Sequence, residues 1–124
     1  MKKIFVVEDD SFFLDIITDK LAENENLNVS GFSSAEACLK ELGNNPDLIV
    51  LDYYLDKEDP SAMNGMEALK KIKNHSPLMK VIMLSGQESL NTADELLNAG
   101  ADDYVIKDGD AIKILNKKIQ KILG

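Results

Sequence analysis

The chain has 124 residues, 44% of them hydrophobic and 29% charged, and its formal net charge is −8 at pH 7. This size and composition are typical of one globular domain, so we expect residues 1–124 to fold as a single unit. The sequence contains no arginine, and its acidic balance excludes a typical nucleic-acid-binding protein, because such proteins contact phosphates through basic patches and often read guanine with arginine.

The first apolar run, residues 3–7, contains IFVV and predicts a strand that is covered on both faces. A helical pattern follows over residues 11–24. The apolar residues at helical spacing in this segment are Phe12, Ile16 and Leu21. Of the adjacent Phe12 and Phe13, we expect one to join the core and the other to be available for contact with a partner protein.

A second strand is predicted over residues 28–32, followed by a helix over residues 33–42. Ser33 and Glu36 have the spacing of a capping box, in which two side chains satisfy backbone N–H groups at the start of a helix. Cys38 falls on the apolar side of this helix, so we expect a buried thiol. It is the only cysteine, which excludes an intramolecular disulfide.

The third and fourth strands are predicted over residues 47–51 and 80–84, whose runs LIVL and VIML are again continuously apolar. Between them a helix is predicted over residues 66–74, which ends before Pro77. No segment approaches the roughly 20 consecutive apolar residues that span a bilayer, and no signal peptide is recognisable. We therefore expect a cytoplasmic protein that does not enter a membrane.

The C-terminal part predicts a helix over residues 88–98 that is closed by Gly100, a strand over residues 103–106 and a helix over residues 111–123. The apolar stripe of this last helix consists of Ile112, Leu115, Ile119 and Ile122. Alternation of strands and helices predicts an α/β, doubly wound, five-stranded parallel sheet of strand order 2-1-3-4-5, a flavodoxin-like three-layer α/β/α fold.

Polar side chains follow four of the predicted strands, and in such a sheet ligands bind at the carboxyl ends of the strands. The first strand runs into Glu8-Asp9-Asp10 and the third into Asp52, so four carboxylates should converge. Crowded carboxylates are stable when they bind a cation, and Mg²⁺ prefers oxygen ligands. A hydroxyl and an ammonium follow the other two strands, at Ser85 and Lys107, and these groups suit a transferring phosphoryl group.

Each of these groups also has an ordinary structural interpretation. The acidic triplet can serve the first turn of a helix, Asp52 and Ser85 can cap helices, and Lys107 can be a surface residue. Taken singly, neither interpretation is favoured. Their joint placement at the ends of four strands favours a functional site.

The motifs VVEDD, LIVLD, NGMEAL, VIMLSG and GADDYVIK, in this order, resemble the CheY-like receiver domain of two-component response regulators over essentially the whole chain. The resemblance implies that Asp52 is the phosphoacceptor. It also implies a Mg²⁺ site, with Mn²⁺ as a substitute, formed by Asp9, Asp52 and the backbone carbonyl of Tyr54, with Glu8 acting through a water molecule.

The same resemblance implies that Ser85, Gly86 and Lys107 bind the phosphoryl group and that Tyr104 is the aromatic residue of the switch. The switching surface would be formed by residues 88–123. The expected partners are a sensor histidine kinase or a histidine phosphotransfer protein and an unknown output protein. The domain would assist its own phosphorylation without turning over a separate substrate, as a monomer or a transient phosphorylation-dependent dimer.

The sequence departs from the family pattern at a few places. Asp56 and Asp108 stand where the family usually has proline, and Gly86 replaces a common alanine. The stretch between Asp52 and Gly65 is longer than usual. These departures keep open a second hypothesis, a binding module that has the fold but signals by contact alone.

Two other classes of protein fit the sequence less well. A phosphatase with an aspartate nucleophile would carry two aspartates as D-x-D at one strand end, and 124 residues leave no room for its cap domain. A flavodoxin-type FMN binder would need a hydroxyl-rich and glycine-rich loop after the first strand. The acidic triplet Glu8-Asp9-Asp10 would repel the FMN phosphate, so we rank both hypotheses below the receiver.

Overall fold

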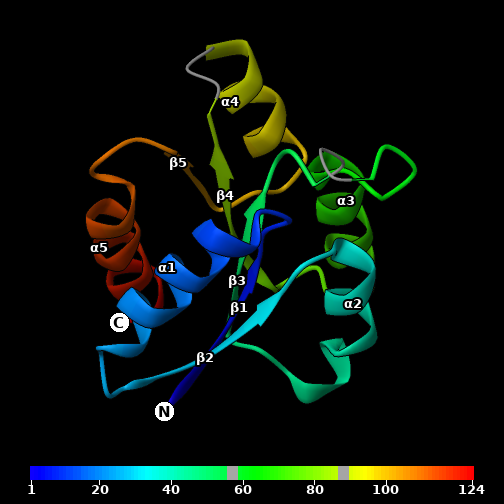
Figure 1. Ribbon diagram of the computed structural model, residues 1–124. Coiled ribbons are helices and arrows are strands. Elements are labelled where there is room, and N and C mark those ends of the chain that lie inside the picture. Colours follow the sequence, from blue (N-terminus) through cyan, green and yellow to red (C-terminus); the bar gives the residue numbers. More distant parts are fainter. Residues whose placement is uncertain (56–58, 87–89) are drawn as a thin grey trace.

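The computed structural model describes residues 1–55, 59–86 and 90–124. Five parallel strands form one sheet in the order β2-β1-β3-β4-β5 (Figure 1). The strands are β1 (Lys2–Val7), β2 (Leu27–Phe32), β3 (Leu48–Asp52), β4 (Lys80–Ser85) and β5 (Asp103–Ile106). The predicted α/β fold and its strand order are therefore confirmed.

Helices cover both faces of the sheet, with α1 and α5 on one side and α2 and α3 on the other (Figure 1). They are α1 (Ser11–Ala22), α2 (Ala35–Lys40), a 3₁₀ turn (Leu42–Asn44), α3 (Gly65–His75), α4 (Leu90–Asn98) and α5 (Ala111–Leu123). The first residues of the helix predicted over 88–98 lie outside the described residues. In the part of the chain that is described, no helix is both long and apolar enough to cross a membrane.

The core consists of two apolar clusters separated by the sheet. All five residues of β3 are buried, and the side chains of the first four alternate between the clusters. Leu48 and Val50 pack with residues of α1 and α5, whereas Ile49 and Leu51 pack with residues of α2 and α3. This arrangement confirms that the continuously apolar run is a strand covered on both faces.

The apolar face predicted for α1 was wrong by one residue at Phe12 and at Ile16 and correct at Leu21. Asp10 caps the helix, and the residues turned to the sheet are the partly buried Phe13 followed by the buried Ile17 and Leu21 at intervals of one helical turn. Phe12 is 74% exposed because it lies one position away from that row. Phe13 is thus the phenylalanine that joins the core.

The capping box predicted at Ser33 was also wrong. Ser34 is the N-cap of α2, and its hydroxyl accepts a hydrogen bond from the backbone N–H of Ala37 at 3.1 Å. The carboxylate of Glu36 instead accepts a hydrogen bond from the backbone N–H of Met63 at 3.0 Å. Glu36 therefore ties α2 to the loop that precedes α3.

Cys38 is buried as predicted, and burial raises the pKa of its thiol to about 12. Since thiol reagents attack through the thiolate, a pKa about 3 units above the ordinary value lowers the reactive fraction about a thousandfold. We expect Ellman's reagent to leave Cys38 unmodified in native protein and to react with one thiol per chain in denaturant. Rapid labelling of native protein would show that α2 opens readily.

Candidate functional site

The backbone ladder continues to the ends of the central strands and fixes the residues that border the site. Asp52 pairs with Leu84 in the register of β3 and β4, and Ser85 pairs with Ile106 in that of β4 and β5. The N–H of Tyr53 donates to the Leu84 carbonyl at 2.8 Å. In the same way, the N–H of Lys107 donates to the Ser85 carbonyl at 2.8 Å. Residues distant in sequence are thereby brought to one rim of the sheet.

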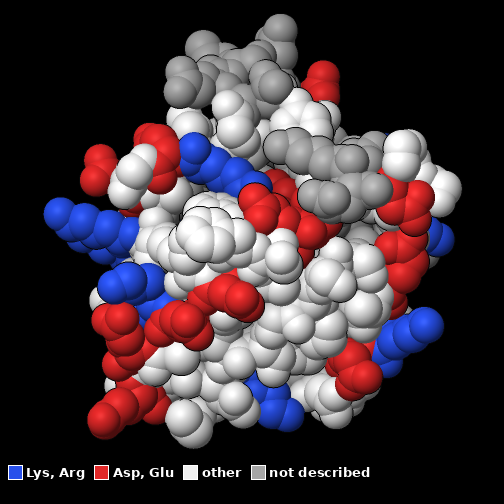
Figure 2. All heavy atoms as spheres, in the orientation of Figure 1, with Lys and Arg blue, Asp and Glu red and all other residues white. Residues whose placement is uncertain are grey.

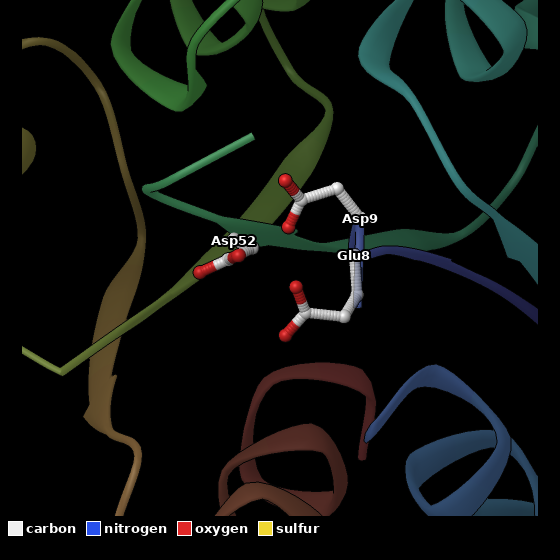
Figure 3. A group of neighbouring side chains, drawn as sticks. All are labelled: Glu8, Asp9 and Asp52. Atoms are coloured by element: carbon white, nitrogen blue, oxygen red, sulfur yellow. The ribbon is translucent and has the colours of Figure 1, made fainter. Parts of the chain in front are cut away.

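Three carboxylates meet at this rim, as Figure 3 shows. Glu8 and Asp9 follow β1 and Asp52 ends β3, and each offers an oxygen within 4.8 Å of the others. The side chains of Glu8 and Asp9 extend toward the side on which Asp52 lies (Figure 3). Glu8 and Asp52 are each only 1% exposed, so two of the three carboxylates are buried almost completely.

Asp10 does not join this group, although the sequence predicted four converging carboxylates. Its side chain accepts hydrogen bonds from the backbone N–H groups of Phe12 at 3.1 Å and Phe13 at 3.4 Å. This is the N-cap geometry that satisfies the free donors at a helix start. The acidic triplet is therefore divided between the site, to which it gives Glu8 and Asp9, and the first turn of α1.

Lys107 supplies a positive charge beside the carboxylates. Its ammonium forms ion pairs with Glu8 and with Asp52, the latter at 3.4 Å. Burial of the ammonium lowers its pKa, but hydrogen bonding to Glu8 and the charges of Asp52 and Glu8 outweigh burial and raise the pKa overall. Lys107 thus remains a cation at the site. On the face of the molecule drawn in Figure 2, basic and acidic side chains lie next to one another near the centre.

The Asp52 carboxyl group has a pKa raised to about 8. Burial is the largest cause, and the neighbouring Glu8 adds to it, whereas the charge of Lys107 acts in the opposite direction. Among the described residues, neither Asp52 oxygen accepts a hydrogen bond of standard geometry. Within the described ranges, two buried carboxylates therefore share the single cation Lys107, and the balance at Asp52 still favours its neutral form.

A hard divalent cation fits this deficit. Mg²⁺ binds oxygen ligands, and it takes one or two carboxylates together with water and phosphate oxygens. The group of Glu8, Asp9 and Asp52 offers such oxygens, and the two Asp52 oxygens are buried with no hydrogen bond of standard geometry in the described part of the chain. The acidic cluster is thus consistent with a Mg²⁺ site.

The other predicted site residues lie around the same rim or close to it. Ser85 is fully buried at the end of β4, and Gly86 follows it in an exposed position. Tyr54 lies two residues beyond Asp52, and its ring makes an edge-to-face contact with that of Tyr53 at 4.8 Å between centroids. Tyr104 is partly buried on β5 and packs against the cluster on the α2 and α3 side.

Of the two aspartates that replace family prolines, Asp56 lies outside the described residues. Asp108 begins the turn into α5, and its backbone N–H donates to the Ile106 carbonyl at 2.9 Å. A proline has no N–H and would lose this bond. The Asp108 carboxylate also accepts a hydrogen bond from the N–H of Asp110 at 2.9 Å. Asp108 therefore has a local structural role in this loop.

Gly65 belongs to the site region, although its sequence pattern alone did not mark it as a site residue. It is the first residue of α3, and its N–H donates to the Tyr53 carbonyl at 2.9 Å. A Cβ atom at this position would lie 2.3 Å from the carbonyl oxygen of Asp52 and 2.6 Å from Cα of Tyr53. Only glycine permits this approach. The signal in the sequence that could have marked Gly65 is the Asn64-Gly65 dipeptide, which is typical of a turn and precedes the predicted helix over residues 66–74.

Comparison with known proteins agrees with this geometry. The sequence profile of the response regulator receiver domain matches residues 4–119. The chemotaxis protein CheY of Bacillus subtilis is 28% identical over 123 residues, which are 98% of this chain and 98% of that protein. A protein-glutamate methylesterase/protein-glutamine glutaminase of Bacillus licheniformis is 33% identical over 127 residues. That match covers 99% of this chain, and the chain spans 34% of the length of that protein.

Solved structures give the same result. The receiver domain of DrrB, a response regulator of Thermotoga maritima solved in a state described as activated by BeF3, is 30% identical to this chain. The two superpose with a TM-score of 0.85 over 99% of this chain and 97% of that one. The chain therefore belongs to the family of response regulator receiver domains, which act in two-component signalling.

Proposed function

We propose that residues 1–124 form one receiver domain that accepts a phosphoryl group on Asp52 in a Mg²⁺-dependent reaction. One observation carries this proposal. The Asp52 carboxylate is buried and, among the described residues, lacks hydrogen bonds of standard geometry, yet it lies beside two further carboxylates and the ammonium of Lys107. Such a group has a high free energy until added positive charge stabilises it, which is typical of functional sites.

The reaction we propose is a nucleophilic displacement at phosphorus. A carboxylate oxygen of Asp52 attacks the phosphoryl group of a phosphohistidine or of a small acyl phosphate. The new O–P bond forms as the P–N bond of phosphohistidine, or the P–O bond of the small donor, breaks. The leaving imidazole or carboxylate takes the bonding electron pair, and Asp52 becomes an aspartyl phosphate.

Residues of the rim would bind the metal and the phosphoryl oxygens. Mg²⁺, or Mn²⁺ in its place, would neutralise charge when held by Asp9, Asp52 and the Tyr54 carbonyl, with Glu8 acting through water. The ammonium of Lys107 would pair with one phosphoryl oxygen. The hydroxyl of Ser85 and the backbone N–H of Gly86 would donate to the others.

Output would follow from the added negative charge. A phosphoryl group brings about −1.5 to −2 charge and strong acceptor oxygens, which can shift a surface between two states. We place that surface at residues 88–123, with the Tyr104 ring reporting its state. The donor would be a sensor histidine kinase or a histidine phosphotransfer protein in the cytoplasm. The chain would act on an output protein as a monomer or a transient dimer and would turn over no separate substrate.

The test is phosphorylation by acetyl phosphate, followed by intact-mass measurement. We expect wild-type protein to gain one phosphoryl group when Mg²⁺ is present and none when EDTA removes it. Asp52→Asn should gain none under either condition. Asp59→Asn is the matched control, because Asp59 is an exposed aspartate of the adjacent loop whose carboxylate accepts hydrogen bonds from Ser61, and it should behave as wild type.

Two results would contradict the proposal. An adduct that persists in Asp52→Asn would place the phosphoryl group on another residue. The absence of any adduct in the folded wild-type protein would favour a module that signals by contact alone. Asp56 and Asp108, which stand where the family usually has proline, would then be the first residues to test by substitution.

A further inference from the structure

The ammonium of Lys107 has a third neighbour besides Glu8 and Asp52. Its Nζ atom lies 4.8 Å from the centroid of the Phe13 ring. This distance is within the range of a cation–π interaction, in which the negative face of the ring attracts a cation. The Lys107 side chain is only 19% exposed. The ring therefore contacts an ammonium that is largely removed from water, the condition under which such contacts are strongest.

The position of the Phe13 ring is fixed by its own surroundings. Asp10 caps α1 by accepting hydrogen bonds from the N–H groups of Phe12 and Phe13, which sets where the helix begins. The ring is partly buried and packs against the apolar cluster on the α1 and α5 side. Phe12, one residue earlier, is 74% exposed. Its ring is therefore much less restricted by neighbouring side chains than the ring of Phe13.

Lysine needs such a support more than most residues. Its ammonium stands on a flexible four-carbon stem, and holding it at one point costs side-chain entropy. Glu8 and Asp52 attract the ammonium, but both are also candidate metal ligands whose charge Mg²⁺ would offset. The Phe13 ring is uncharged, so its attraction for the ammonium does not depend on whether the carboxylates are occupied.

We propose that Phe13 is a positioning residue, which holds the Lys107 ammonium beside Asp52 so that the ammonium can pair with the incoming phosphoryl group. The effect on phosphorylation rests on the proposed function of Asp52. The contact between ring and ammonium does not, and it can be measured separately.

The first measurement follows the ring contact itself by NMR. Protons that lie over an aromatic face are shifted upfield, so the Hε protons of Lys107 should resonate upfield of those of exposed lysines in wild-type protein. Phe13→Leu should remove this shift, and Phe13→Tyr should keep it. Phe12→Leu is the control and should also keep it. Absence of the shift in wild-type protein would overturn the proposal, whatever the protein does with acetyl phosphate.

The second measurement is the rate of phosphorylation by acetyl phosphate at saturating Mg²⁺. Phe13→Leu should slow it about threefold to tenfold, the range that corresponds to one cation–π contact, with Phe13→Tyr and Phe12→Leu near the wild-type rate. In a Lys107→Ala background, Phe13→Leu should cause no further loss, because the contact through which it acts is gone. An equal loss in both backgrounds would overturn the proposal.

Two controls distinguish a failure of this proposal from misfolding of the variant and from failure of the proposed function. Thermal unfolding shows whether Phe13→Leu is folded, and Phe13→Met, which also fills the core without a ring, replaces it if it is not. If wild-type protein accepts no phosphoryl group, the proposed function fails. A ring-dependent upfield shift in that case still supports the positioning of Lys107 by Phe13.

Discussion

Replacement of Gly65 by alanine is expected to lower the free energy of unfolding sharply, although it adds only one methyl group. The added Cβ would lie 2.3 Å from the Asp52 carbonyl oxygen and 2.7 Å from that of Tyr53. Both neighbours are backbone atoms, which cannot turn aside as a flexible side chain can. Overpacking of this kind costs typically about 1–3 kcal/mol, and we expect the free energy of unfolding to fall by about 3 kcal/mol or more.

The same substitution should weaken the site, because relief of the clash requires α3 or the segment after Asp52 to move. We expect a lower Mg²⁺ affinity, measured by titration calorimetry, in whatever fraction of Gly65→Ala is folded. Gly43→Ala is the matched control: a Cβ atom there meets nothing within 4 Å. Its unfolding midpoint in urea should stay close to that of wild type. Equal stability of the two variants would show that the start of α3 lies farther from the end of β3 than in this structure, with room for a Cβ atom at residue 65.

The second large effect concerns the pH dependence of stability in the absence of metal. The pKa of Asp52 is raised from 3.8 to about 8 in the folded protein, chiefly by burial. Between these values the folded state binds one proton more than the unfolded state, so the free energy of unfolding falls as the pH rises. A shift of about 4 units at about 1.4 kcal/mol per unit sets a ceiling of about 6 kcal/mol on this loss, reached above about pH 8.

Asp52→Asn should remove this contribution, because an amide of the same shape carries no charge at any pH. We expect urea denaturation in EDTA to show wild-type protein losing stability relative to the variant between about pH 4 and about pH 8. At about pH 9 the variant should be the more stable of the two.

Mg²⁺ provides the control for this experiment. Because a ligand that binds only the folded state stabilises it, added Mg²⁺ should restore stability to wild-type protein at high pH and have a smaller effect on Asp52→Asn. Parallel pH profiles for the two proteins in EDTA would contradict the expectation. They would show that water or Lys107 satisfies the buried carboxylate without a metal.

The strands and the residues at their ends were predictable because two independent signals coincide there. A continuously apolar run marks a strand covered on both faces, and a sudden polar residue marks its end. Asp52 and Ser85 were expected just after their strands and are in fact the last residues of β3 and β4. This difference of one position leaves their common place at the rim unchanged.

The features that could not be predicted are those in which two adjacent residues have similar chemistry and only the packing of the folded chain decides which of them takes the role. Ser33 and Ser34 can both cap a helix, and the burial of Ala35 and Cys38 against the sheet selects Ser34. Phe12 and Phe13 can both fill a core, and the start of α1 at Asp10 selects Phe13. The contact of Phe13 with Lys107 and the close approach of Gly65 to β3 require the folded arrangement itself.

The sheet that separates the two apolar clusters also has a consequence for how such a sequence diverges. No residue belongs to both clusters among those described, so a change of volume beside α1 and α5 has no direct contact with the packing beside α2 and α3. Each side can therefore accumulate its own compensating replacements over evolutionary time, independently of the other. Such drift is compatible with the 30% identity and the TM-score of 0.85 shared with the DrrB receiver domain. The rim is the exception, because residues from both sides meet there around Asp52, and a replacement at the rim must suit both neighbours at once.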